Sequence, residues 1–585
     1  MSFLFTIMSR RRTPLRMTVR PMLVGAALLV GCAGDNSSVF ADPHTPSDPV
    51  LGVAYDAITA DDLLRHVQVL SADSLEGRAP TTIGEEKTVR YLESQFRAMG
   101  LSGGMPDGSF VQYVTMRAYT PHPEASFHIG SRQLPLAFPN DYVVVSRQGQ
   151  PTVDVDAEMV FVGYGVEAPE YGWDDFKNVD LSGKVVLMLI NDPAIPDPRD
   201  STKLDSTMFR GNAMTYYGRW TYKIETAAAR GAAAALIIHE TGPAGYPFSV
   251  AINGWSRESF DIDTPEQRAA RVIVEGWLRQ GPAEELLSAA GLNFAALKAA
   301  ARQKDFKPVP LGARARIRVR SESYPVQSRN VVAMLPGSDS LLRKEYLIYT
   351  AHWDHLGRDT SATGDQIFNG ARDNASGVSQ LLSIAKGFTA LPNRPKRSVI
   401  FAALTGEEKG MLGARYFAAQ PPVPLSDVLA GINLVRFNTW GRTKDLMVIG
   451  HGSTTLEDVL NDALAASGRG IVPDPEPEKG FFYRSSHVEL ARRGVPVLYT
   501  HHGLQFVDRD SAFGRQKRDE YTSRDFHQPS DEVRPDWDLA GAVADTRVML
   551  DVGYRILMGS SWPTWKPGSE FKAQRDASLR ARGSR

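Results

Sequence analysis

The part of the sequence that decides the fold contains three motifs: EYLIYTAHWDHLG (345–357), NGARDNASG (369–377) and SVIFAALTGEE (398–408). The apolar runs 347–351 and 398–404 are short and uninterrupted, which is typical of strands buried on both faces of a parallel sheet. Each run leads into polar residues, and the middle motif predicts a turn followed by a helix. Because open α/β sheets bind ligands beyond the carboxyl ends of their strands, we expect the three polar segments to meet in one site.

These polar segments carry side chains that can bind a metal ion. A hydrolytic metal site needs imidazole nitrogen and carboxylate oxygen ligands and an open position for water, and His352, Asp373 and Glu408 meet that need. A histidine that binds metal usually donates its other ring N–H to a carboxylate, and Asp354 lies two residues after His352. Adjacent glutamates point in different directions, so Glu407 can act as general base while Glu408 binds metal. We therefore predict a metal site with Glu407 and Asp354 in catalytic roles.

Each motif taken alone also has an ordinary structural explanation. The pattern His-x-Asp occurs often by chance, DNASG is compatible with a helix N-cap, and EEKG is compatible with a solvated helix start. The order and spacing of the motifs and their shared position at strand ends favour the metal site, because the separate explanations do not account for them together.

Taken together, the motifs resemble the co-catalytic zinc aminopeptidases of the Streptomyces and Aeromonas type, with glutamate carboxypeptidase II and the transferrin receptor as distant relatives. The matching pieces are AHWDHLG, GARDNASG, GEEKGMLGARYF, LSADSLEGRAP and FHQPSDE, and the resemblance covers nearly all of residues 57–559. It implies an α/β fold with a mixed, mostly parallel sheet sandwiched by helices. It also implies two Zn²⁺ ions bridged by Asp373, one held further by Glu408 and His527 and the other by His352 and one more aspartate.

That last aspartate is absent from this chain. The family places it after a strand that ends Ile-Asn-Leu, and here GINLVRFN has Val435 at the ligand position, followed by Arg436. An isopropyl group cannot coordinate a cation, and a neighbouring guanidinium would repel one. A second departure is Ser486, where the family often has an aspartate. Three outcomes stay open: two zinc ions with a substitute ligand, one zinc held by the remaining ligands, or a metal-poor relative that binds without catalysis.

The resemblance implies a zinc-dependent metallopeptidase of the aminopeptidase type, acting on a peptide or protein substrate. A carboxypeptidase or another amide hydrolase that uses the same site is one alternative. A catalytically inactive binding protein of the same fold is the other, and Val435 keeps it open. The sequence indicates neither the preferred side chain of the substrate nor the oligomeric state.

Composition indicates the general class of the protein and argues against a nucleic-acid partner. The 585 residues are 42% hydrophobic and 23% charged with a formal net charge of −1, which is typical of a globular protein with several domains. Nucleic-acid binding is not expected, because no Lys/Arg-rich patch is interleaved with aromatic residues.

The amino terminus predicts export from a bacterial cytoplasm. A basic stretch is followed by the apolar PMLVGAALLVG and by Cys32, the layout of a secretory signal. The residues LVGC (29–32) resemble the bacterial lipoprotein box, which implies a signal peptide over 1–32 and lipidation of Cys32, the only cysteine in the chain. Membrane contact would then be limited to this anchor at the cell envelope, in the periplasm or outer membrane. Cleavage after Ala41, which would give a secreted protein, is the alternative.

Changes in composition and in the pattern of apolar residues divide the remaining chain into segments. Residues 33–56 are expected to form a flexible tether, 57–115 and 326–560 the two parts of a catalytic domain, and 561–585 a polar tail. Residues 116–325 resemble the β-rich protease-associated domain that interrupts many family members. In the family the segment around FFYRSSH lines the substrate pocket, so Tyr483 and His487 are the predicted pocket residues.

Overall fold

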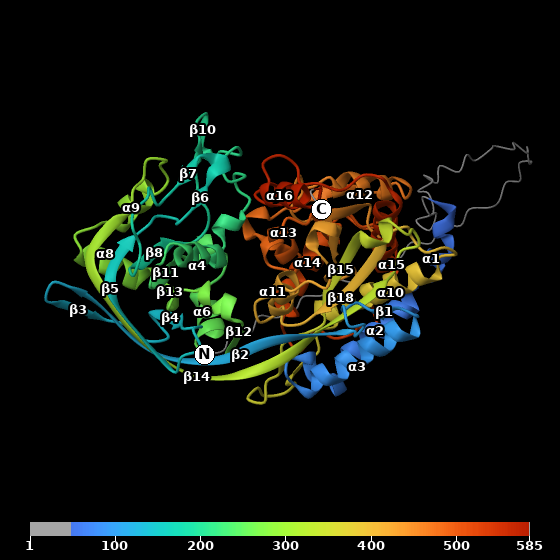
Figure 1. Cartoon of the computed structure of the whole chain (residues 1–585), viewed down its shortest axis with the longest axis horizontal. Coiled ribbons are helices and arrows are strands. Elements are labelled where there is room, and N and C mark those ends of the chain that lie inside the picture. The colour runs from blue at the N-terminus through green and yellow to red at the C-terminus, as the bar shows by residue number, and fades with distance from the viewer. Residues whose placement is uncertain (1–47, 584–585) are drawn as a thin grey trace, which may run out of the picture. The chain divides into compact units, whose positions relative to one another are not determined.

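In the computed structural model, which describes residues 48–583, the three motifs lie in a mixed sheet covered by helices (Figure 1). The strand order around them is β21-β20-β22-β19-β15-β18-β14. Its strands are β14 (Val309–Leu335), β15 (Tyr346–His352), β18 (Ser398–Leu404), β19 (Val428–Asn433), β20 (Asp445–Val448), β21 (Gly470–Pro473) and β22 (Val497–His502). Strands β18, β15, β19 and β22 run parallel, whereas β14 and β20 each pair antiparallel with a neighbour. The predicted mixed, mostly parallel sheet is confirmed.

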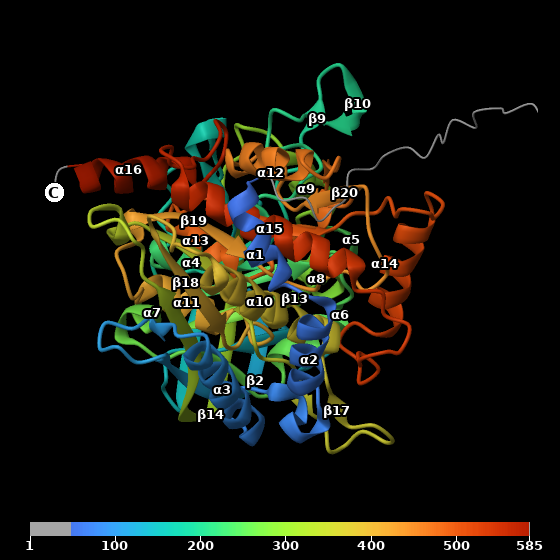
Figure 2. The same ribbon diagram turned by 90° about the vertical axis from the view of Figure 1, so that its right-hand side faces the viewer.

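Helices cover both faces of this sheet because successive side chains of a strand point to opposite faces. Leu347, Tyr349 and Ala351 of β15 belong to one apolar core, and Ile348 belongs to another. The first core is closed by α2 (Ala60–Leu70), α3 (Ile83–Ala98), α10 (Ser376–Ala390) and α15 (Ala540–Met558), which face the viewer in Figure 2. The second core is closed by α11 (Leu412–Ala419) and α13 (His487–Arg492). The polar ends of β15 and β18 are thereby left as the place where a site can form.

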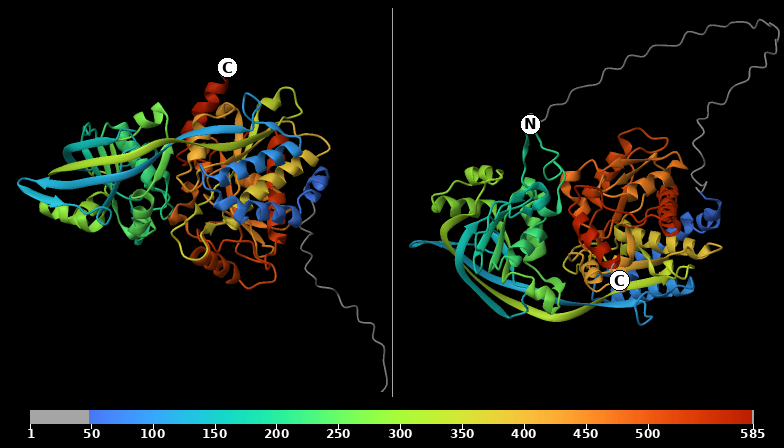
Figure 3. Two further views of the ribbon diagram at one scale, coloured as in Figure 1. Left: turned by 90° about the horizontal axis from the view of Figure 1, so that it is seen from below. Right: turned by 45° about the horizontal axis from the view of Figure 1, so that its top comes forward.

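The insert predicted between the two catalytic parts is a continuation of the same sheet. Strand β2 (Val111–Ile129) pairs along its length with β14, and both strands run from the catalytic part into the insert (Figure 3). Beyond β14 the order is β5-β8-β11-β13-β4. These strands are β4 (Tyr142–Val145), β5 (Thr152–Phe161), β8 (Val185–Leu189), β11 (Ala234–His239) and β13 (Val274–Arg279), and helices α4 (Trp220–Ala229) and α8 (Gln280–Ala289) lie among them. The expected boundaries at 116 and 325 fall inside β2 and β14, because these two strands stay paired with each other through both positions. The identity of the insert as a protease-associated domain stays a prediction.

Both terminal segments contain more structure than the sequence indicated. The end of the expected tether is helical in η1 (Pro49–Leu51) and α1 (Gly52–Asp56), where Leu51 and Tyr55 are buried. The segment expected to be a polar tail contains Trp565 and Phe571, which are buried in the second core, and α16 (Lys572–Gly583) follows them. In both segments a few apolar residues, spaced among polar ones, are enough to fix the backbone against the sheet layers.

The predicted signal peptide, Cys32 and most of the tether lie outside the described residues. Among residues 48–583, no helix combines the length and the apolar character needed to cross a bilayer.

Candidate metal centre

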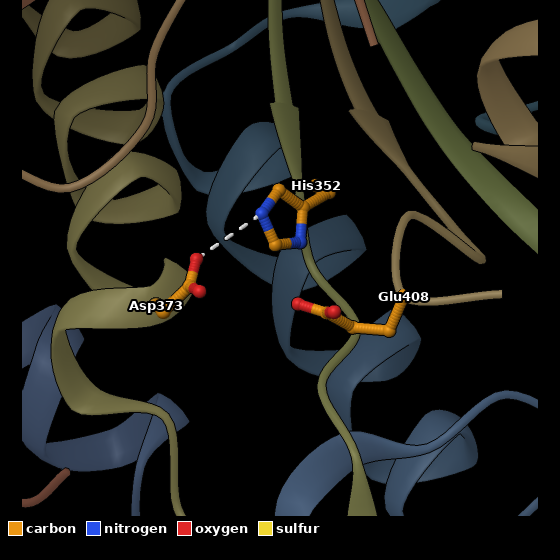
Figure 4. A group of neighbouring side chains, drawn as sticks. All are labelled: His352, Asp373 and Glu408. Atoms are coloured by element: carbon orange, nitrogen blue, oxygen red, sulfur yellow. Dashed lines mark ion pairs between the residues drawn. The ribbon is translucent and has the colours of Figure 1, made fainter. Parts of the chain in front are cut away.

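The three motifs meet at the carboxyl ends of β15 and β18. These strands are aligned with His352 opposite Leu404, so the loop that follows Leu404 passes close to His352. The short helical turn η6 (Ala371–Ala375) brings Asp373 to the same place, just ahead of α10. Figure 4 shows His352, Asp373 and Glu408 directed toward one common point, and each offers a ligand atom within 4.8 Å of the others.

The two carboxylate oxygens of Asp373 face different histidines. Asp373 Oδ1 lies 3.5 Å from His352 Nε2, and Asp373 Oδ2 lies 3.3 Å from His527 Nε2. The same nitrogen of His527 lies 3.2 Å from Glu408 Oε2. The four predicted ligands therefore converge from four separate segments of the chain. We call the side of Asp373 with His527 and Glu408 the Oδ2 half of the site, and the side with His352 the Oδ1 half.

The charged side chains of this cluster shift the pKa values of one another. Burial alone would lower the pKa of His527, but the Glu408 and Asp373 carboxylates outweigh it and raise that pKa to about 10. Burial would raise the pKa of Asp373, yet His352 and His527 hold it well below its usual range. The pKa of Glu408 is likewise low, because His527 outweighs the effect of burial. The carboxylates stay charged at neutral pH and attract positive charge, and a set of two imidazoles and two carboxylates suits Zn²⁺.

Asp354 faces His352 and also contacts the loop that carries the two glutamates. Its carboxylate accepts the backbone N–H of Glu407 at 3.0 Å and that of Glu408 at 3.3 Å. His352 Nδ1 lies 3.2 Å from the backbone oxygen of Asp354 and 3.7 Å from its carboxylate, which is beyond hydrogen-bond length. Asp354 therefore fixes the loop that carries both glutamates, and it acts on His352 through its charge.

Glu407 lies beside the cluster and does not join it. Its carboxylate accepts the backbone N–H of Ser486 at 3.0 Å and the Ser486 hydroxyl. Burial raises the pKa of Glu407 to about 7, against the opposing effects of His352 and Ser486. A carboxylate that exchanges a proton near neutral pH is suited to general acid–base chemistry.

Three residues that the sequence reasoning missed complete the surroundings. Asp531 accepts the backbone N–H of Asp373 at 3.0 Å, and His355 Nδ1 lies 3.5 Å from Glu408 Oε1. Arg78 is fully buried and donates to the backbone oxygens of Trp353 at 3.0 Å and Gly370 at 3.0 Å, which ties the first two motifs together. The signal was present, because these residues lie in the quoted pieces FHQPSDE, AHWDHLG and LSADSLEGRAP.

The two predicted pocket residues lie in the protein interior instead. Tyr483 is 3% exposed and its hydroxyl donates to Glu570. His487 is 1% exposed, starts α13 and packs against the ring of Tyr499 with 4.6 Å between ring centroids. Tyr483 belongs to the second core and also lines a cavity of about 200 Å³, so its role in a substrate pocket stays a prediction, as does that of His487.

The substituted position is part of that same apolar core. Val435 is buried among the residues that line the second core, and Ser486 is engaged with Glu407. The backbone N–H of Arg436 donates to Asn374 Oδ1 at 3.0 Å. Burial would lower the pKa of Arg436, but Asp373 raises it above its usual value, so this charge acts on the carboxylate that both halves of the site share.

Comparison with known proteins gives the following similarities. Residues 330–550 match the model of peptidase family M28. Probable zinc metalloproteases of Leptosphaeria maculans and Pyrenophora teres are each 36% identical, over 96 and 112 residues, or 16% and 19% of this chain. These matches span 21% and 23% of the relatives' own length, about a fifth.

Two solved structures are similar over a larger share of the chain. An aminopeptidase from Aneurinibacillus sp. strain AM-1 is 19% identical with a TM-score of 0.46, covering 89% of this chain and 97% of that one. A zinc aminopeptidase from Bacillus subtilis is 16% identical with a TM-score of 0.41, covering 88% and 97%.

Proposed function

We propose that this chain, whose residues 330–550 match peptidase family M28, is a zinc-dependent peptidase that removes residues from the amino terminus of peptides. The observation that carries the proposal is the convergence of Asp373, Glu408 and His527 within 3.3 Å contacts, with the buried Glu407 beside them. The aminopeptidase names of the similar structures agree with the proposal and are not its basis.

The residues present divide the chemistry between them. Zinc, when bound by Asp373, Glu408 and His527, would supply a Lewis acid that polarises the peptide carbonyl and makes water a better nucleophile. Glu407 takes a proton from the attacking water as its oxygen bonds to the carbonyl carbon. As the C–N bond breaks, Glu407 returns that proton to the leaving amine. Asp354 holds Glu407 and Glu408 in the same loop, so the general base and the ligand keep their spacing.

We also propose that the site holds one zinc ion per chain. The Oδ2 half offers Glu408, His527 and one oxygen of Asp373. In the Oδ1 half, Val435 provides no ligand atom where the resemblance implies one, and the Arg436 charge acts on Asp373. Three protein ligands with an open position for water are sufficient for a catalytic zinc site.

The test is metal content and turnover measured on the same preparation. Purified protein is analysed for bound zinc, and hydrolysis of a panel of aminoacyl p-nitroanilides is followed before dialysis against a chelator, after it, and after zinc is added back. We expect about one zinc per chain, loss of turnover with the metal, and recovery with zinc.

Two other results are informative. Two zinc ions with turnover would keep the peptidase and remove the single-ion proposal. No zinc and no turnover on any substrate, even with zinc added, would contradict the peptidase proposal. That result would favour the alternative of an inactive binding protein, which Val435 leaves open.

For the amino terminus we propose export and lipidation of Cys32, which rests on the sequence motif LVGC (29–32). The mass of the mature protein's amino-terminal peptide tests it, with Cys32→Ser as the control. An unmodified terminus starting after Ala41 would favour the secreted form.

A further inference from the structure

A cavity of about 240 Å³ lies beside the metal centre. Arg372 and Phe526 line it, and they precede the metal-centre residues Asp373 and His527 in the chain. Arg436, which follows the substituted position Val435, lines it as well. The ring of Phe526 stacks on that of His527 with 3.9 Å between the ring centroids. A peptide whose scissile bond lies at Asp373 and His527 would place a neighbouring group in this cavity.

The cavity is lined by guanidinium groups that lack carboxylate partners. Arg372, Arg436 and Arg484 all face it, and none forms an ion pair within the described part of the chain, residues 48–583. Arg372 is the most constrained. It is 4% exposed, and its guanidinium lies between Trp440 and Tyr521, 4.1 Å from each ring centroid. Its Nε and Nη1 atoms are buried without a hydrogen-bond partner.

Aromatic rings also contact the other two arginines, and the Asp373 carboxylate acts on the charge of Arg436 as well. The Arg436 guanidinium lies 5.0 Å from the Phe526 ring centroid, and that of Arg484 lies 5.9 Å from the Tyr246 ring centroid. The Nε of Arg484 is buried and has no hydrogen-bond partner. Ring stacking fixes the orientation of a guanidinium but leaves its N–H donors available to an anion.

Asp373 offsets part of the Arg436 charge, and the acids that line the cavity do not pair with Arg372 or Arg484. Glu476 is paired with Lys479 at 2.6 Å and with Arg518 at 2.7 Å, and Arg518 also lies 3.6 Å from Asp519. Asp474 is the remaining acid of the lining, and burial raises its pKa. The surroundings therefore carry an excess of positive charge. Consistent with this, burial lowers the pKa of His502 to about 3, and the charge of Arg372 adds to the effect.

A buried charge without a partner is costly, and the cost is recovered when an oppositely charged group enters with good hydrogen-bond geometry. Guanidinium groups bind carboxylates through paired N–H donors, and in a desolvated cavity such bonds are stronger than at the surface. An uncharged side chain would leave these donors unsatisfied, so the cavity discriminates against it.

We propose that this cavity binds a carboxylate of the peptide substrate, held by Arg372, Arg436 and Arg484, next to the bond that is cut. The proposal rests on the proposed peptidase function and adds the class of substrate. The carboxylate has two possible sources: the acidic side chain of an amino-terminal Glu or Asp, or the α-carboxylate of a carboxyl-terminal residue. The first keeps the aminopeptidase, and the second changes it to a carboxypeptidase.

The experiment compares pairs of substrates that differ in one charge. Hydrolysis of glutamyl p-nitroanilide is compared with that of glutaminyl p-nitroanilide, and hydrolysis of N-acetyl-alanyl-glutamate with that of its α-amide. We expect kcat/KM to favour the charged member of one pair by about tenfold or more, since a charged hydrogen bond in a buried site is worth that much. The pair that shows the preference identifies the source of the carboxylate.

Variants connect the preference to the arginines. Arg484→Gln and Arg372→Met should each reduce the charged-to-neutral ratio by about tenfold, mainly through KM. Lys479→Met is the matched control, because Lys479 is a cation of the same lining that Glu476 already pairs, and the ratio should stay as in the wild type. If Arg372→Met does not fold, Arg484→Gln decides the question alone.

The failures can be told apart. Turnover without preference for the charged member of either pair overturns the carboxylate site and leaves the peptidase intact. Absence of turnover on every substrate overturns the peptidase itself. A preference that survives both arginine variants also overturns the proposal.

Discussion

The two halves of the metal centre are built differently, although they share Asp373. In the Oδ2 half, His527 contacts both Asp373 and Glu408, at 3.3 Å and 3.2 Å. In the Oδ1 half, His352 lies 3.5 Å from Asp373, and the position where a further ligand is expected from the family belongs to Val435 in an apolar core. The Oδ2 half thus offers three ligands, whereas the Oδ1 half has no ligand atom at position 435, and this contrast underlies the single-ion proposal.

The largest expected effect separates the two halves directly. His527→Ala removes the histidine that contacts two carboxylates, so we expect zinc content to fall close to zero and kcat/KM to fall by about 10³-fold. His352→Ala removes a contact to one oxygen of Asp373, and we expect most zinc to remain and a loss of about 10–100-fold. Equal zinc loss in the two variants, measured by elemental analysis, would show that the halves are equivalent.

The second prediction removes the base and keeps both halves. Glu407→Gln preserves the shape of the side chain but cannot take a proton, so kcat should fall by about 10²–10⁴-fold while zinc content stays unchanged. Loss of zinc in this variant would assign Glu407 to the metal ligands.

A third variant restores a carboxylate ligand to the Oδ1 half of the site. Val435→Asp supplies the carboxylate that the resemblance implies, and we expect zinc to rise toward two ions per chain, with kcat/KM higher by up to about tenfold. Val435→Leu, which is apolar, is the control for any change in packing and should leave the zinc content as it is. Combining Val435→Asp with Arg436→Met should raise zinc affinity further, because the opposing charge is gone. A zinc content that does not respond to Val435→Asp would contradict our interpretation of this position.

The smallest effect concerns proton transfer. Glu407 acts as base only when unprotonated, so the rate should rise with pH through its pKa. The hydrogen bonds from Ser486 favour the charged form, so Ser486→Ala should raise that pKa and move the ascending limb of kcat/KM to higher pH. The loss at a fixed neutral pH should be less than about tenfold. If the ascending limb of the pH profile moves to lower pH or does not move, Ser486 does not influence the protonation of Glu407.

Much of this arrangement could be predicted from the sequence. Uninterrupted apolar runs fixed β15 and β18 as parallel strands, and parallel neighbours place their carboxyl ends together, which brought His352 and Glu408 into one site. Asp373 followed from the turn before α10. His527 was found by the resemblance alone, because it lies 119 positions after Glu408 and no local periodicity connects the two.

The parts that could not be predicted depend on contacts between distant segments. The role of Asp354 as acceptor for two backbone N–H groups, and that of Arg78 as a buried link between loops, require knowledge of where the loops pass. Tyr483 and His487 were assigned to the pocket by the resemblance, and their burial depends on packing between distant segments that the sequence does not specify. The expected insert boundaries fall within β2 and β14, and the long pairing of these two strands could not be foreseen from local sequence.

The most direct test is a crystal structure of the zinc-loaded protein with anomalous data collected on both sides of the zinc absorption edge. The account predicts one zinc peak per chain at bonding distance from Asp373, Glu408 and His527. The absence of a peak at these side chains, with zinc present in the crystal, would contradict it.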